Sequence, residues 1–149
     1  MAEAQSRQVS LTGLLLPLSD RTLLLPNVAV AELIDYQPGT PVANAPAWHL
    51  GMITWRDLQL PLLGFEAACG GASPLGERAR IVVLNALGDH PLRFIALLIQ
   101  GIPRSCKLDS QLSYVDVPLA ALELAAVQVG ESVARVPDIE GLEALFFNQ

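Results

Sequence analysis

The sequence predicts a mainly β fold, and two observations support this prediction. Apolar runs of about five residues, the usual length of a strand, recur along the 149-residue chain. Between them lie eleven glycines and eleven prolines, a punctuation typical of small β-barrels and sandwiches. Hydrophobic residues make up 52% of the chain and the mean hydropathy is +0.42, so we expect a globular protein with a sizeable core.

Nine strands are predicted from the apolar runs. The two-residue period of a β-strand is clear at 58–62, where Leu58, Leu60 and Leu62 share one face. Pro61 lies between them and indicates an edge or a bulge, because proline cannot donate a hydrogen bond to a ladder. The nine predicted strands span residues 14–18, 22–25, 30–34, 51–55, 58–63, 80–84, 94–99, 127–129 and 132–136.

Helix is predicted to be a minor component, with the best candidate at the C-terminus. There Pro137-Asp138 offers a cap, and apolar residues recur at helical spacing at positions 139, 142, 145 and 146. Residues 118–126 are a second candidate, because alanine, leucine and glutamate favour helix and Pro118 suits a first turn. Pro26-Asn27 could cap a helical turn before the third strand, so that boundary stays open.

Residues 66–77 contain a run of glycine, serine and proline and are predicted to form a flexible loop. This loop divides the chain near its middle. Each half contains several predicted strands, so each half could close its own small barrel.

The charge balance excludes several classes of partner. Fifteen acidic and nine basic residues give a net charge of −6 and a pI near 4.7, which disfavours nucleic acid and anionic membrane surfaces. Charged residues and prolines interrupt every stretch that approaches the roughly 20 apolar residues of a membrane span. The first ten residues, MAEAQSRQVS, lack the basic start and apolar run of a signal peptide. We therefore expect a cytoplasmic protein with no direct membrane insertion.

The sequence gives little support for catalysis or for a cofactor. The common phosphate, dinucleotide, hydrolase and metal motifs do not occur in it, and we expect no cofactor, no metal and no enzyme. Cys69 and Cys106 lie far apart and outside any CxxC pair, so two reduced thiols are predicted. A small hydrolase that pairs His49 with Cys106 or with a serine stays open as an alternative, because catalytic partners meet in space rather than in sequence. His90 lies in a polar turn.

The most specific pattern runs from Val30 to Glu66 and reads VAELIDYQPGTPVANAPAWHLGMITWRDLQLPLLGFE. It resembles the CheW-like coupling domain of bacterial chemosensory systems, whose pattern has V-x-E-I, then N-x-P-A, a glycine, an N-L-R-G hairpin and I-P. The matching segments here are VAEL at 30–33, NAPA at 44–47, Gly51, TWRD at 54–57 and LP at 60–61. Residues 80–85 and 96–102 resemble later segments of the family, so the likeness covers about residues 14–147.

The resemblance implies a fold of two small, intertwined, five-stranded SH3-like barrels with a short C-terminal helix. It implies one CheW-like domain over residues 9–149, preceded by a short tail at 1–8. The family is non-enzymatic, so the resemblance also implies an adaptor. Its expected partners are the cytoplasmic tip of a methyl-accepting chemotaxis receptor and the regulatory domain of a CheA-type histidine kinase, in membrane-associated receptor arrays.

The resemblance also implies which residues bind receptor and kinase. Val30 would line the groove for the receptor tip, with Gly101 and Ile102 on its facing side. Arg56 would be the functional arginine of the hairpin. The full predicted set is Val30, Glu32, Trp55, Arg56, Asp57, Gly101 and Ile102.

Each of these roles has a structural alternative. Val30 could be plain core, Arg56 a surface ion pair, and Trp55 either a buried strand residue or an exposed interface anchor. Asp57 replaces the hairpin glycine and Gln100 replaces the family's aspartate. These departures leave open a divergent CheW-like binding module that has lost kinase coupling. The Trp-Arg-Asp variant suggests the branch that serves type IV pilus twitching motility.

Overall fold

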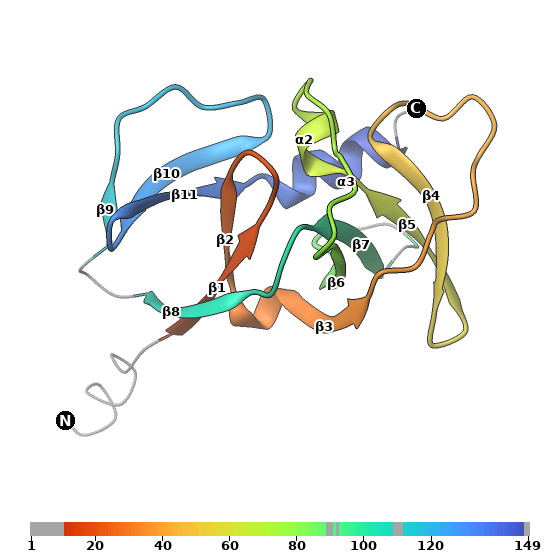
Figure 1. Cartoon of the computed structure of the whole chain (residues 1–149), viewed down its shortest axis with the longest axis horizontal. Helices are drawn as coiled ribbons and strands as arrows, with labels where there is room; N and C mark the ends of the chain where they lie inside the picture. Colours follow the sequence, from red (N-terminus) through yellow and green to blue (C-terminus); the bar gives the residue numbers. More distant parts are fainter. Residues whose placement is uncertain (1–10, 89–90, 92, 109–111, 148–149) are drawn as a thin grey trace.

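The computed structural model describes residues 11–88, 91, 93–108 and 112–147. These residues form two β-sheets with short helices at their junction (Figure 1). The elements are β1 (Leu11–Pro17), β2 (Thr22–Pro26), the 3₁₀ helix η1 (Asn27–Ala29), β3 (Val30–Asp35), β4 (His49–Trp55), β5 (Leu58–Leu63), α2 (Phe65–Ala68), β6 (Arg80–Asn85), β7 (Phe94–Ile99), β8 (Arg104–Leu108), β9 (Ser113–Tyr114), β10 (Glu123–Val129), β11 (Ser132–Pro137) and α3 (Ile139–Phe147).

The two sheets draw on the chain differently. One has the strand order β3-β6-β7-β5-β4 and comes from a continuous stretch of the chain. The other has the order β8-β1-β2-β11-β10-β9 and joins the start of the chain to its end. The prediction that each half closes its own barrel is therefore wrong, because β1 and β2 pair with strands of the second half. The mainly β fold with two sheets is confirmed, and β9 adds a sixth, two-residue strand to one sheet.

The five-stranded sheet curls until its two outermost strands meet. The indole Nε1 of Trp55 on β4 donates to Glu32 Oε1 on β3 at 2.9 Å. Beyond β3, Gln37 Nε2 donates to the carbonyl of Thr54 at 3.3 Å, and Thr40 forms a β-bridge with Met52. This sheet therefore closes on itself as a small barrel.

Strand β7 shows how the core is organised. Its residues alternate between two clusters, with Ile95, Leu97 and Ile99 in the cluster between the sheets and Ala96 and Leu98 inside the barrel. All five are buried, because both faces of the strand are covered. A strand buried on both faces reads as a continuous apolar run, which is why FIALLI was recognisable as a strand.

A buried carboxylate joins the two sheets. Glu66 lies on α2, which follows β5, and is fully buried. It accepts hydrogen bonds from the backbone N–H of Ser19 at 2.9 Å, from the Ser19 hydroxyl, and from the Ser73 hydroxyl at 3.3 Å. Ser19 belongs to the turn between β1 and β2, so this carboxylate fixes one sheet against the other.

Three local predictions need correction. Residues 118–126 form no helix, since strand β10 begins at Glu123 and pairs with β11, so tertiary pairing overrides local propensity. Residues 66–68, predicted as loop, belong to α2. Strands β8 and β9 were missed, because their residues are mostly polar or exposed.

Other local predictions are confirmed or settled. Asn27–Ala29 form a 3₁₀ turn, which settles the open boundary before β3. The C-terminal helix is confirmed as α3, and Asp138 Oδ1 accepts from the N–H of Gly141 at 2.9 Å at its start. The predicted tail at 1–8 and His90 lie outside the described residues.

Candidate functional site

The β4–β5 hairpin contains three of the predicted site residues. Trp55 pairs with Leu58, so the loop has only two residues, Arg56 and Asp57. Their φ angles are +49° and +65°, and positive φ at both positions is the mark of a type I′ turn. Glycine or asparagine is favoured there because most L-residues are strained in this region. Asp57 thus adopts the geometry that the family's glycine supplies, at a cost in backbone strain.

Glu32, Trp55 and Arg56 contact one another, and we call them the hairpin cluster. Glu32 Oε1 accepts from Trp55 Nε1 at 2.9 Å and from Arg56 Nη2 at 3.1 Å. The Arg56 guanidinium lies over the Trp55 ring, 4.6 Å from its centroid. The cluster holds an otherwise flexible arginine in one place, with 68% of its side chain exposed.

Trp55 is a buried strand residue rather than an exposed anchor. Only 6% of it is exposed, and its ring packs edge-on against Phe94 with centroids 4.8 Å apart. Its indole N–H is satisfied by Glu32. The buried Trp55 ring therefore packs under the Arg56 guanidinium, and Arg56 forms the solvent-exposed surface of the cluster.

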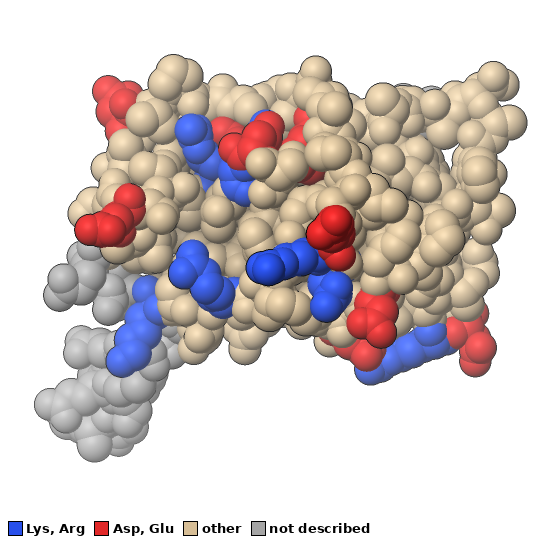
Figure 2. Space-filling view, in the orientation of Figure 1, with Lys and Arg blue, Asp and Glu red and all other residues tan. Residues whose placement is uncertain are grey.

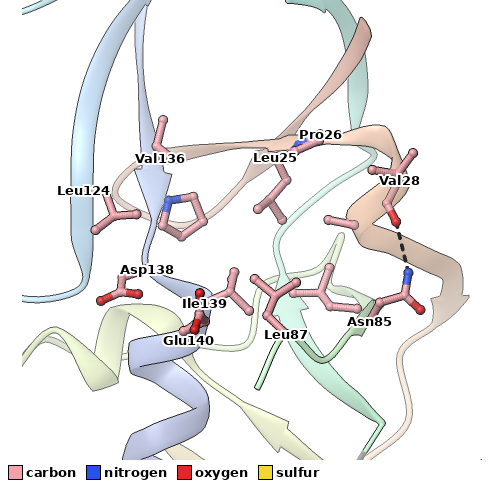
Figure 3. A pocket seen from close by; sticks show the side chains of 13 residues that line it. Leu25, Pro26, Val28, Asn85, Leu87, Leu124, Val136, Asp138, Ile139 and Glu140 are labelled. Carbon is pink, nitrogen blue, oxygen red and sulfur yellow. Dashed lines mark hydrogen bonds between the residues drawn. The ribbon is translucent and has the colours of Figure 1, made fainter. Parts of the chain in front are cut away.

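An apolar pocket of about 300 Å³ opens between the two sheets, and we call it the inter-sheet groove (Figure 3). Three of its apolar side chains are strongly exposed: Val28 at 80%, Leu124 at 60% and Leu87 at 56%. The carboxylates of Asp138 and Glu140 lie among its lining residues. The lining comprises Leu25, Pro26, Val28, Ala29, Leu84, Asn85, Leu87, Leu124, Val136, Pro137, Asp138, Ile139 and Glu140.

One hydrogen bond fixes a wall of the groove. Asn85 Nδ2 at the end of β6 donates to the carbonyl of Val28 at 3.0 Å, drawn as the dashed line in Figure 3. This bond ties η1 to β6 and holds the Val28 side chain at the pocket. Val30 is half-buried and packs against the inter-sheet core. The residues just before it, Val28 and Ala29, line the groove in its place.

Gly101 and Ile102 lie away from Val30. Val30 pairs with Leu84 at the end of β6, whereas β7 ends at Ile99 opposite Arg80, at the start of β6. The two sets of residues are therefore at opposite ends of the same ladder. Ile102 is 58% exposed.

Gly101 and its neighbour Gln100 have local structural roles. Gly101 is buried, and a Cβ there would lie 3.2 Å from Pro17 Cγ. Gln100 Nε2 donates to the Pro74 carbonyl at 2.6 Å, and its Oε1 accepts from the Gly76 N–H at 2.9 Å. The neutral amide that replaces the family's aspartate thus fastens the 74–76 loop.

Comparison with known proteins places this geometry in a family. The family model described as the CheW-like domain matches residues 12–145. The chain belongs to the CheW-like domain family. It is 28% identical over 75 residues to "Chemotaxis protein CheW" of Rhizobium meliloti (strain 1021), a match that spans 50% of this chain and 46%, about half, of that relative. The crystal structure of the scaffolding protein TtCheW from Thermoanaerobacter tengcongensis has the same fold, with a TM-score of 0.76 at 15% identity over 90% of this chain and 88% of that one.

Within this CheW-like fold, His49 and Cys106 do not form a catalytic pair. His49 is on β4 of one sheet and Cys106 on β8 of the other. Burial lowers the pKa of His49, and its Nδ1 accepts from the Gly51 N–H at 3.2 Å. Burial raises the pKa of the Cys106 thiol, which disfavours the reactive thiolate. Both features are those of structural residues.

The described residues contain neither a metal-binding cluster nor a membrane-spanning helix. No group of three or more His, Cys, Asp or Glu in that part of the chain is arranged to hold a metal ion. None of the helices described there has the length and apolar character needed to cross a membrane.

The sequence predicts only part of this CheW-like site. The hairpin cluster could be predicted, because Glu32, Trp55 and Arg56 all lie in the motif-bearing segment. The inter-sheet groove could not be predicted, because its exposed apolar residues Val28, Leu87 and Leu124 come from three distant segments. Single exposed apolar residues are common on protein surfaces, so only the fold shows that these three form one surface.

Proposed function

We propose that this chain is a non-enzymatic adaptor that couples chemoreceptors to a CheA-type histidine kinase in a bacterial chemosensory array. The observation that carries the proposal is the inter-sheet groove, because it is an exposed apolar surface in a chain of the CheW-like family. Exposed apolar surface rimmed by polar groups is typical of protein-binding sites. The protein would then act in the cytoplasm, recruited to membrane-associated receptors.

The inter-sheet groove is our proposed site for the receptor tip. Its apolar lining suits a helix, because apolar side chains one turn apart on a helix can enter a single apolar groove. Val28 and Leu124 lie on its two walls, from η1 and β10. Exposed apolar residues of this kind lose their contact with water on binding, which supplies the affinity.

The hairpin is our proposed contact for the kinase. Arg56 is held by Glu32 and Trp55 while most of its side chain is exposed. Arginine is enriched at the centres of interfaces, and an arginine that is already fixed loses little conformational entropy on binding. Coupling by such an adaptor is geometric, because binding both partners biases which kinase conformation is populated.

The decisive experiment is a binding titration. The purified protein is titrated with the C-terminal barrel domain of a CheA-type kinase and, separately, with a receptor-tip fragment. We expect saturable binding to both. Val28→Asp should weaken receptor-tip binding by at least about tenfold, since a charge would enter the apolar groove. Arg56→Ala should weaken kinase binding to a similar extent.

Two controls make the titration interpretable. Leu75→Asp places the same charge at a residue that is 59% exposed and outside the groove, so it should leave both affinities unchanged. Far-ultraviolet circular dichroism should show an unchanged fold for all variants. Receptor binding without kinase binding would support the divergent module instead, and absence of both would contradict the adaptor. Comparing receptors of pilus and flagellar systems would test the twitching-motility branch.

A further inference from the structure

Strand β8 (Arg104–Leu108) is an edge of the six-stranded sheet. It pairs with β1 from Leu11↔Leu108 to Leu15↔Arg104. In the part of the chain that the structure describes, no strand pairs with its other side. Every second residue of an edge strand directs its backbone N–H and C=O outward, so such an edge is a template for another strand. Backbone groups for one added strand are thus available here.

Basic side chains concentrate at this edge. Arg104, Lys107 and Arg78 are exposed and Arg80 is half-buried; we call these four residues the basic band. They are four of only nine basic residues in a chain of net charge −6. Figure 2 shows lysine and arginine side chains in a row along the lower part of this face, over β8 and the segment that leads into β6.

The fold connects the two parts of the band, Arg78 with Arg80 and Arg104 with Lys107. Gln100, four residues before β8, is hydrogen-bonded to the 74–76 loop that precedes Arg78. Arg80 pairs in register with Ile99 at the end of β7. The segment 99–104 therefore links the region that contains Arg78 and Arg80 to the start of the edge strand.

The band retains free positive charge. The ion pairs found among the described residues involve Arg21, Arg56 and Arg135, and none involves a member of the band. Three acids lie close to it in sequence or register: Glu77 precedes Arg78, Asp35 is the ladder partner of Arg80, and Asp109 comes two residues after Lys107. The four basic residues still outnumber these three acids by one.

An apolar groove lies behind the same edge. Leu108 at the end of β8 lines a second pocket, of about 700 Å³, together with Leu24, Tyr114 and Leu124. Tyr114 is 83% exposed and Leu124 is 60% exposed. Because side chains alternate along a strand, Cys106 and Leu108 face this apolar side, and both pack against the small core cluster there. Arg104 is on the same side of the strand as Cys106 and Leu108, whereas Ser105 and Lys107 face the opposite side.

We propose that β8 receives an extended acidic segment of a partner protein as an added strand. Its backbone pairs with the free edge of β8, carboxylates on one of its faces contact the basic band on the Lys107 side, and apolar side chains on its other face enter the groove behind Leu108. The β8 edge and the basic band share no residue with the inter-sheet groove or the hairpin cluster, although Leu124 lines both apolar pockets. The proposal therefore does not depend on the proposed function. Lysines also guard edge strands against aggregation, but that role does not require two arginines from the other sheet.

The test uses a labelled peptide and the full-length protein. A fluorescein-labelled, end-capped heptapeptide of alternating glutamate and valine is titrated by fluorescence anisotropy. We expect saturable binding that weakens as salt rises, because exposed charges are screened. Lys107→Glu should weaken binding at least about tenfold, while Arg93→Glu, which makes the same charge change at an exposed residue outside the band, should leave it unchanged.

Strand addition is tested separately from charge attraction. A peptide N-methylated at alternate residues cannot donate to β8 and should lose binding, and amide hydrogen exchange in β8 should slow only with the unmethylated peptide. Equal binding of both peptides would overturn the proposal in favour of a charge contact alone. Absence of peptide binding would overturn it and leave a guarding role for the cations. Binding to phosphatidylserine vesicles, or self-association abolished by Lys107→Glu, in place of peptide binding would also overturn it.

Discussion

The two sheets differ in how completely they are packed. The barrel of β3–β7 encloses nine buried residues, including Trp55 and Leu60. The sheet made from both ends of the chain has a separate cluster of only four: Leu15, Leu24, Val127 and Ala134. The closed barrel is thus the rigid support, whereas the second sheet keeps a free edge and an apolar pocket. The two apolar surfaces that we propose for partners lie where packing is left incomplete.

A pair of matched truncations tests this difference. Leu98→Ala lies inside the closed barrel at 2% exposure, and we expect it to lower the free energy of unfolding by about 2–5 kcal/mol. Leu24→Ala borders the 700 Å³ pocket and should cost less, because part of its surroundings is already open. Urea denaturation monitored by circular dichroism measures both. A larger loss at Leu24 would contradict the comparison.

The contact between the sheets depends on Glu66. Glu66→Ala removes the acceptor for the Ser19 N–H and hydroxyl, so we expect a loss of about 1–3 kcal/mol, the usual cost of a buried donor left unsatisfied. Glu66→Gln keeps an acceptor oxygen and should cost less. Hydrogen exchange should show faster opening of the β1–β2 turn in the alanine variant. An unchanged exchange rate would argue that apolar packing alone holds the sheets together.

The hairpin turn of the closed barrel carries strain that can be removed. Asp57 has φ +65°, where glycine is unstrained, so Asp57→Gly should stabilise the protein by up to about 1 kcal/mol. Thermal denaturation would detect this as a higher midpoint. Asp57→Ala keeps a Cβ and serves as the control, with no gain expected. A fall in stability with glycine would show that the Asp57 side chain contributes more than its strain costs.

The smallest effect concerns His49. Burial lowers its pKa from the ordinary value of 6.5, so the unfolded chain binds a proton more readily than the folded chain. Stability should therefore be full above about pH 6.5 and fall as the pH drops below it. His49→Gln should show a smaller fall between pH 7.5 and pH 5.5 in urea unfolding. The same fall in both proteins would assign it to other groups.

The sequence predicted the parts of the fold that local patterns encode. Alternating and continuous apolar runs located most strands, including FIALLI, which becomes β7. The prediction of a helix at 118–126 was wrong, because alanine and leucine favour helix locally whereas pairing with β11 makes β10 a strand. Strand β8 was not predicted, because its sequence RSCKL has the composition of an exposed edge strand. Its identity as a strand depends on pairing with β1, which no local window contains.

The candidate site also has a part that local sequence predicts and a part that depends on long-range contacts. Trp55 and Arg56 are adjacent in sequence, and Glu32 belongs to the same motif-bearing segment, so the hairpin cluster was predictable. The burial of Trp55 was not, because it depends on Phe94 from β7. The inter-sheet groove draws on residues from 25 to 140. Such a surface exists only after both ends of the chain have come together.

The pairing of β2 with β11 also constrains the order of events during synthesis. Leu23 and Arg135 are register partners although more than a hundred residues separate them. While a ribosome makes the intervening chain, β3–β7 can close as a barrel, but β1 and β2 still lack their neighbours. Long-range pairing slows folding because the chain between must first lose entropy. Leu15 and Leu24, whose cluster partners Val127 and Ala134 are on β10 and β11, therefore stay exposed until the last strands emerge. This exposure makes the early hairpin the natural client for a chaperone.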